Sequence, residues 1–178
     1  MPQTMPELEV VKEAVLLACR APSVHNSQPW HWVSEGAGLD LFVDRGRWLH
    51  STDHSGREAI ISCGAVLDHL HIAMVAAGWQ AHIERFPNPN NLDHLASFKF
   101  SPLEFVTDAQ RNRAEAILQR RTDRLPFRCP TFWARFEPVL RGSVGGTVAM
   151  VDVLSDEVRS PLAEASRLTE TVRRYDDS

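Results

Sequence analysis

The sequence has no excess of positive charge and few residues that could cross-link it. It carries 19 Lys and Arg against 23 Asp and Glu among 178 residues, a formal net charge of −4. A protein that grips nucleic-acid phosphates normally has a clear surplus of Lys and Arg, so we expect no nucleic-acid partner. The three cysteines stand far apart without a C-x-x-C spacing, which indicates a reducing compartment such as the cytoplasm rather than a disulfide framework.

Long uninterrupted apolar runs are also missing. The most apolar stretch, 60–83, is broken by Asp68 and by three histidines. The first residues lack the basic segment and apolar run of an export signal, so we expect neither a membrane partner nor export. The glycines are too scattered for a dinucleotide-binding or phosphate-binding loop. Ordinary globular composition, 43% hydrophobic and 24% charged, then predicts one or two small folded domains.

The apolar periodicity of the first hundred residues predicts an α+β fold. A helix is expected to end near Arg20, and β-favouring runs at 30–33 and 39–43 read as a hairpin. A second helix over 55–77 is apolar over much of its girth, so we expect it in the middle of the protein or in an interface. In that helix Gly64 and the following alanine would let another backbone approach closely. Further strands are predicted after the helix, on either side of a Pro- and Asn-rich turn.

The remainder of the chain predicts more helix. A capping-box pattern starts at Thr107 and opens a helix that ends before the cationic run 120–124. A connector rich in Pro and aromatic residues is expected over 126–138, followed by a strand over 147–153. The last segment, 161–175, is helical by pattern.

The loop at 21–29 is one candidate binding segment. It concentrates Ser23, Asn26 and Gln28, whose side chains both donate and accept hydrogen bonds and so suit the edge of a planar polar ligand. The same residue types also serve loops that merely satisfy their own backbone. Composition alone leaves both interpretations open.

The run at 120–124 is the other candidate. Three guanidiniums and the Thr122 hydroxyl within five residues suit a phosphate dianion, because each Arg fork can bond two oxygens and stays charged. Arg side chains near a helix C-terminus are also favoured by the helix dipole, so a solvated helix cap remains the alternative.

Other constellations point to no chemistry. His69 and His71 are two residues apart in a predicted helix and project to different sides, so we expect no metal site. The 53–55 segment, Asp-His-Ser, has the residue types of a hydrolase triad but no G-x-S-x-G motif accompanies it. We therefore expect no hydrolase triad at this segment.

Taken together, the two candidate segments resemble the FMN-dependent nitroreductase family. Pro22-Ser23-x-x-Asn26-Ser27-Gln28-Pro29-Trp30 is similar to the family's flavin-binding segment, and Arg120-Arg121-Thr122-x-Arg124 resembles its basic Arg-Arg-Ser-x-Arg motif. The whole chain, including 51–58 and 84–89, resembles the N-terminal half of the Acg-like branch, a divergent group of mycobacterial nitroreductases.

This resemblance implies a nitroreductase-like α+β fold that is truncated, with a central apolar helix against an antiparallel or mixed sheet. A first nitroreductase-like unit would span 1–106 and an incomplete second one 107–178, with FMN at their interface. The implied cofactor-binding residues are Ser23, Asn26, Gln28, Arg120, Arg121, Thr122 and Arg124.

The resemblance also implies an activity: an NAD(P)H-dependent oxidoreductase that passes electrons through FMN to nitro or quinone-type acceptors. The flavin would carry the chemistry, so no catalytic side chain is expected, and nicotinamide would be the cosubstrate. Two alternatives stay open, a flavin-sequestering protein without reductase activity and an inactive truncated fragment. Acg-like chains are longer than this one, so a homodimer or the missing C-terminal half would complete the site.

Overall fold

The computed structural model describes residues 6–35, 38–123, 125, 128, 130–144 and 150–176. The chain divides into two compact units, Met1–Thr122 and Asp123–Ser178. The helix that begins after Thr107 therefore belongs with the first unit. That two nitroreductase-like repeats divide at residue 106 stays a prediction.

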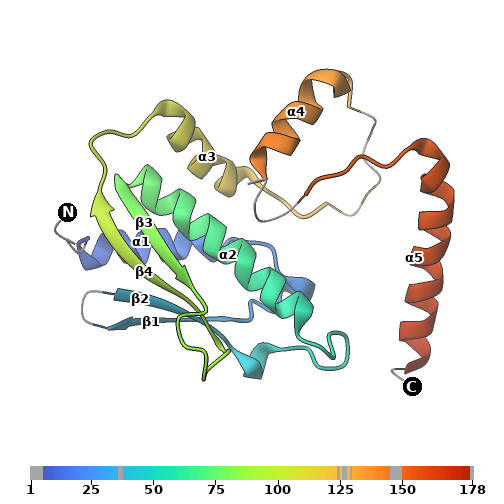
Figure 1. Ribbon diagram of the computed structural model, residues 1–178, viewed down its shortest axis with the longest axis horizontal. Coiled ribbons are helices and arrows are strands. Elements are labelled where there is room, and N and C mark those ends of the chain that lie inside the picture. Colours follow the sequence, from blue (N-terminus) through green and yellow to red (C-terminus); the bar gives the residue numbers. More distant parts are fainter. Residues whose placement is uncertain are drawn as a thin grey trace. The chain divides into compact units, whose positions relative to one another are not determined.

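In its described residues the first unit combines an antiparallel four-stranded sheet with three α-helices, which confirms the α+β class expected from the sequence (Figure 1). The strand order is β1-β2-β4-β3, so the pairing of β2 with β4 skips one strand along the chain. The elements are α1 (Leu8–Ala18), β1 (Trp30–Glu35), β2 (Gly38–Val43), α2 (Arg57–Ala76), β3 (Trp79–Arg85), β4 (His94–Pro102) and α3 (Asp108–Gln119).

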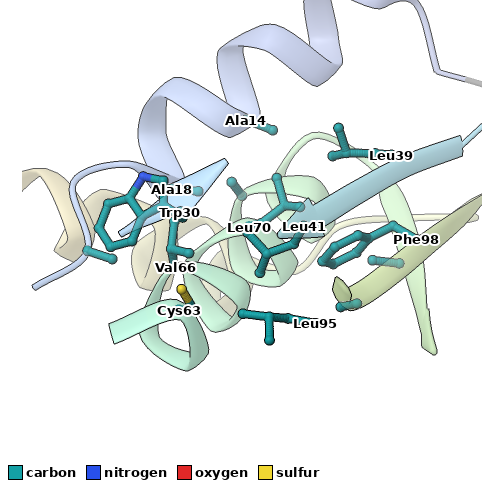
Figure 2. Close-up of a cluster of buried hydrophobic side chains, with 14 of the residues drawn as sticks. Ala14, Ala18, Trp30, Leu39, Leu41, Cys63, Val66, Leu70, Leu95 and Phe98 are labelled. Atoms are coloured by element: carbon teal, nitrogen blue, oxygen red, sulfur yellow. The ribbon is translucent and has the colours of Figure 1, made fainter. Parts of the chain in front are cut away.

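The core of this unit lies between the sheet and the helices. In β2 every second side chain is buried, the pattern of a strand with one face against a core. Leu41 pairs with Ala96 and Leu39 with Phe98 across the β2–β4 ladder, so these apolar side chains share one face. They belong to one buried cluster with Leu70 of α2, which lies beside Leu41 in Figure 2.

Helix α2 is the central apolar helix that the sequence predicts. Its length and composition would suffice to cross a bilayer, but half of its most apolar window is buried inside the structure. Val66, Leu70 and Met74 are fully buried in the core. A Cβ built on Gly64 meets nothing within 4 Å, so the close approach predicted there is not found among the described residues.

The start of α2 is fixed by a buried carboxylate. Asp53 is only 5% exposed, and its Oδ2 accepts a hydrogen bond from the Ala59 amide at 2.9 Å. The Trp48 indole Nε1 donates to the Asp53 carbonyl at 2.6 Å. Gly56, at φ 72°, precedes the helix, and a Cβ there would overlap the Trp48 ring. Asp53 is thus occupied as a helix cap, since carboxylates satisfy the free amides of a first turn.

The described part of the second unit contains two helices, α4 (Trp133–Ser143) and α5 (Asp156–Asp176), and their side chains are largely exposed as far as Val172. The connector predicted over 126–138 is wrong from Trp133 onward. Apolar residues at helical spacing, among them Trp133 and Phe136 with ring centroids 6.1 Å apart, outweigh the prolines there.

Two further expectations for this region need correction. Residues 150–153 of the strand predicted over 147–153 form no strand, and 145–149 lie outside the described residues. The last helix begins at Asp156 rather than at 161. Acidic side chains at 156 and 157 favour that earlier start, because negative charge stabilises a helix N-terminus.

Replacing Gly56 with Ala should lower the free energy of unfolding by about 2–4 kcal/mol, since the new methyl group needs both a left-handed backbone and space taken by Trp48. Gly64→Ala, inside the helix that Gly56 precedes, is the matched control. It should raise stability by about 0.5–1 kcal/mol, because Ala favours a helix interior. Urea denaturation measures both, and a Gly56→Ala protein as stable as the wild type would contradict the packing.

Candidate functional site

The 21–29 loop is an ordered and strained turn between α1 and β1. It contains the short helical turn η1 (Val24–Asn26). Three of its non-glycine residues have positive φ, His25 at 48°, Asn26 at 57° and Gln28 at 49°. Left-handed backbone at such residues costs about 1–3 kcal/mol each and persists only where surrounding contacts hold it. Such strain often accompanies functional sites, which supports the ligand-binding interpretation of the loop.

All three predicted residues make hydrogen bonds at the loop: the Asn26 amide donates to the Ser23 carbonyl at 3.1 Å, and the side chains of Ser23 and Gln28 make the others. Ser23 Oγ accepts a hydrogen bond from the Gln28 amide at 3.0 Å. The Gln28 side chain reaches back to α1, where its Nε2 donates to the Cys19 carbonyl at 3.5 Å. Asn26 is exposed. Part of this polar loop therefore does satisfy its own backbone, while Asn26 faces outward.

Helix α2 holds the loop from the other side. The Val24 amide donates to Ser62 Oγ at 3.1 Å, and the Cys63 thiol donates to the Pro29 carbonyl at 3.2 Å. Burial raises the pKa of Cys63 to about 12, so the thiol keeps its proton. Neither contact has a local signature, since Ser62 and Cys63 are distant from the loop in sequence.

The 120–124 run begins where α3 ends, and Arg120 ties that end to α1. Its Nη2 donates to the Arg20 carbonyl at 2.7 Å and its Nη1 to Thr122 Oγ1 at 3.4 Å. Arg20 returns the contact, with Nη2 donating to the Leu118 carbonyl at 3.2 Å. The two guanidiniums thus join the C-terminal ends of α1 and α3.

Arg121 acts as a helix cap, the alternative considered for this run. Its Nη1 donates to the carbonyls of Leu118 and Arg120, both at 2.8 Å. A guanidinium there also offsets the negative end of the α3 dipole. Thr122 is exposed, and Arg124 lies outside the described residues.

The two candidate segments therefore meet at one place, the C-terminal end of α1. Gln28 binds the Cys19 carbonyl and Arg120 binds the next carbonyl, that of Arg20. Two residues that are far apart in sequence therefore bind consecutive carbonyls of the same helix end. Ser23 and Asn26 follow in the loop that starts at this point.

Both segments contain a buried polar atom without a partner. Among the described residues these atoms include Ser27 Oγ in the loop and Arg120 Nε in the cationic run. A buried donor left unpaired costs about 1–3 kcal/mol. Because both atoms are buried, neither is open to a ligand in this arrangement of the chain.

A groove of about 300 Å³ adjoins the loop. The loop forms one wall and the first turns of α2 form the other. Ile61 projects from the α2 wall and is 62% exposed. Most of the lining is apolar, with hydroxyls at Ser23 and Ser62 and a carboxylate at Glu58; the complete lining is Pro22, Ser23, Val24, Glu58, Ile61, Ser62 and Ala65.

His69 of α2 lies beside the junction of α1 and α3. Burial lowers its pKa, and the positive charge of Arg120 lowers it further, against opposing effects of Asp68 and of a backbone hydrogen bond with Ala18. The imidazole is therefore neutral at pH 7. Its Nδ1 is buried without a partner among the described residues.

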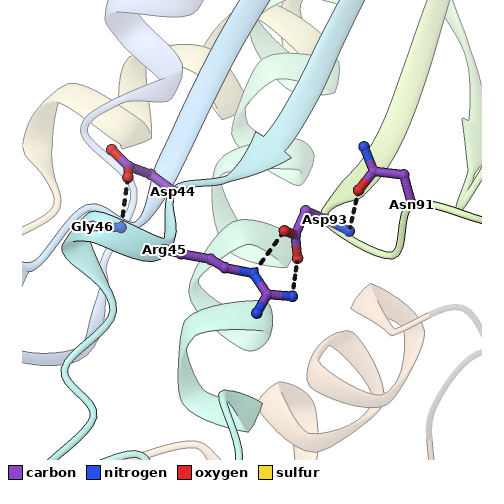
Figure 3. Close-up of polar contacts among 5 residues, drawn as sticks. All are labelled: Asp44, Arg45, Gly46, Asn91 and Asp93. Atoms are coloured by element: carbon purple, nitrogen blue, oxygen red, sulfur yellow. Dashed lines mark hydrogen bonds and ion pairs between the residues drawn. The ribbon is translucent and has the colours of Figure 1, made fainter.

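A second hollow, of about 710 Å³, lies near β1, β2 and the turn before β4. Its charged groups are already paired, as Figure 3 shows: Arg45 donates to both Asp93 oxygens at 2.6 and 2.8 Å. The Arg45 guanidinium lowers the pKa of the Asp93 carboxyl. Asp44 Oδ1 accepts from the Gly46 amide at 2.9 Å. Its charges being paired, this hollow is the weaker binding candidate.

Asp40, His94 and Ser97 form a polar cluster on the sheet that the sequence analysis missed. His94 Nε2 lies 3.1 Å from both Asp40 Oδ1 and Ser97 Oγ, and Ser97 donates to Asp40 at 2.5 Å. A hydrolase triad uses the two different nitrogens of its His, one for the acid and one for the nucleophile. Here one nitrogen meets both groups, so the cluster is no proton relay.

Proteins of Mycobacterium tuberculosis are similar in sequence to this chain. No family model matches the chain. The uncharacterized protein Rv3127 is 63% identical over 171 residues, which cover 94% of this chain and 50% of the relative. The protein named "Putative NAD(P)H nitroreductase acg" is 57% identical over 178 residues, 100% of this chain and 54% of the relative. The chain spans about half the length of these curated relatives.

Solved structures give a weaker likeness. The nitroreductase CinD from Lactococcus lactis, in complex with 4-nitrophenol, matches with a TM-score of 0.47 and 14% identity, over 62% of this chain and 90% of that chain. Similarity at this level supports no inference about function.

The lowered pKa of His69 makes stability depend on pH. The unfolded chain binds a proton at this residue near the ordinary pKa of 6.5, whereas the folded protein does so only at lower pH. The free energy of unfolding should therefore fall as the pH drops from 7 through 6.5, until the folded imidazole is protonated as well. Replacing His69 with Gln should weaken this dependence. Urea denaturation between pH 7 and 5 measures the free energy of unfolding of both proteins. If the difference in this free energy between wild type and variant did not change with pH, the effect would be excluded.

Proposed function

Because this chain is homologous over almost its whole length to the Acg-like branch of the nitroreductase family, we propose that it builds an FMN-binding site of an NAD(P)H-dependent oxidoreductase. One observation carries the proposal: Gln28 and Arg120 bind neighbouring carbonyls at the end of α1. FMN presents a phosphate dianion and a ring with an amide-like edge. A site for it needs cationic donors and neutral hydrogen-bonding groups close together, and these two residues supply one of each.

The chemistry of the residues fits the phosphate. Arg120 and Arg121 each contribute a guanidinium with five N–H donors, so bonds to backbone carbonyls and to a phosphate are compatible. Thr122, and Arg124 by its place in the motif, would add to this end of the site.

The loop and its groove fit the ring. Ser23, Asn26 and Gln28 would contact the polar edge of the ring, and Asn26 is exposed for that role. The apolar wall that includes Ile61 would cover part of the ring face, which favours binding because apolar area leaves water. When bound, FMN supplies electron and hydride transfer between a nicotinamide and a nitro or quinone-type acceptor.

The double variant Arg120→Ala/Arg121→Ala should weaken FMN binding at least about 100-fold, because a charge-assisted hydrogen bond is worth roughly 1.5–3 kcal/mol. Quenching of FMN fluorescence during titration measures the dissociation constant, and circular dichroism verifies that the variant is folded. Arg111→Ala/Arg113→Ala is the matched control, since it removes the same charge from α3 but away from the C-terminal end of that helix.

Unchanged FMN affinity in Arg120→Ala/Arg121→Ala would overturn the assigned phosphate site. An assay of the FMN-loaded wild type distinguishes a reductase from a protein that only sequesters flavin. Oxidation of NAD(P)H in the presence of a nitroaromatic acceptor supports the reductase, whereas tightly bound FMN without turnover supports flavin sequestration.

A further inference from the structure

Two hydrogen bonds from α2 bracket the strained part of the 21–29 loop. The bond to the Val24 amide lies directly before the left-handed residues, and the bond to the Pro29 carbonyl lies directly after them. Both partners on α2 are consecutive, Ser62 and Cys63. The helix therefore contacts the loop at the two points between which its unusual backbone is confined.

The Ser62 hydroxyl both accepts and donates a hydrogen bond. It accepts from the Val24 amide at 3.1 Å and donates to the Glu58 carbonyl of its own helix at 2.7 Å, and Ser62 is only 5% exposed. Ser in a helix interior is less favourable than Ala, and bonding back to the preceding turn adds no stability. The helix alone thus gives no reason for a hydroxyl here, whereas the loop does.

Cys63 makes the complementary contact. The side chain is 1% exposed, and its protonated thiol donates to the Pro29 carbonyl at the point where the loop becomes β1. Pro29 has no amide hydrogen, so the loop end is held there through its carbonyl, which accepts from the Cys63 thiol and also from the Asp44 amide at 3.0 Å.

The geometry points to Ser62 and Cys63 as positioning residues that hold the 21–29 loop in its left-handed shape and so orient the side chains of Ser23, Asn26 and Gln28. They act through the loop and need not touch the ligand. The link to FMN affinity rests on the proposed function, while the hold on the loop does not. This assignment gives α2 a role at the site beyond filling the core.

Amide hydrogen exchange measured by NMR on the full chain tests the hold on the loop without any ligand. In Ser62→Ala the Val24 amide should exchange at least tenfold faster, and FMN should bind at least tenfold more weakly. Ser97→Ala is the matched control, because it also removes a part-buried hydroxyl hydrogen bond in the same unit but away from the loop. It should leave the exchange of Val24 and the FMN affinity unchanged.

A second pair of variants covers the case in which Ser62→Ala fails to fold. Cys63→Ala should speed exchange at Gln28 and weaken FMN binding, and Cys63→Ser should restore both, since its hydroxyl can donate to Pro29. Unchanged exchange in the loop of the alanine variants would overturn the inference, and so would faster exchange with unchanged FMN affinity. A wild type that binds no FMN would instead refute the proposed function, while the exchange rates would still decide whether α2 holds the loop.

Discussion

The candidate site depends on one interaction, the hydrogen bond from Arg120 to the carbonyl of Arg20 at 2.7 Å. This bond fastens the C-terminal end of α3 to the C-terminal end of α1, and Arg20 strengthens the link through the Leu118 carbonyl. Together the two bonds place the cationic run beside the start of the polar loop. Because Gln28 binds the neighbouring carbonyl of Cys19, the same helix end collects both motifs.

For the cationic run, the sequence left a helix cap and a phosphate site as alternatives, and the structure is compatible with both roles. Arg121 caps a helix, as arginines near C-termini commonly do, yet capping and phosphate binding draw on the same fork of donors and need not exclude one another. Next to this charge, His69 is kept neutral by burial and by Arg120. Helix α2 in turn restrains the 21–29 loop, whose left-handed residues would otherwise leave that conformation.

The sequence predicted those features of the fold that depend on residues close together in the chain. The long apolar helix, the alternating strands and the capping box at Thr107 all follow from spacing within a few residues, and the Thr107–Gln110 hydrogen bonds are present. The polar loop was identified from composition, but its anchors on Ser62 and Cys63 were not, because contacts between distant segments leave no local signal. The start of α4 at Trp133 was missed since prolines were weighted above the apolar spacing.

The central claim is that the loop and the cationic run serve one ligand. Titration of ¹⁵N-labelled wild-type protein with FMN, followed by backbone amide chemical shifts, tests this most directly. The account predicts saturable shifts at residues 23–28 and at 120–122 with a single dissociation constant. Shifts confined to the hollow near Arg45, or at only one of the two segments, would contradict it.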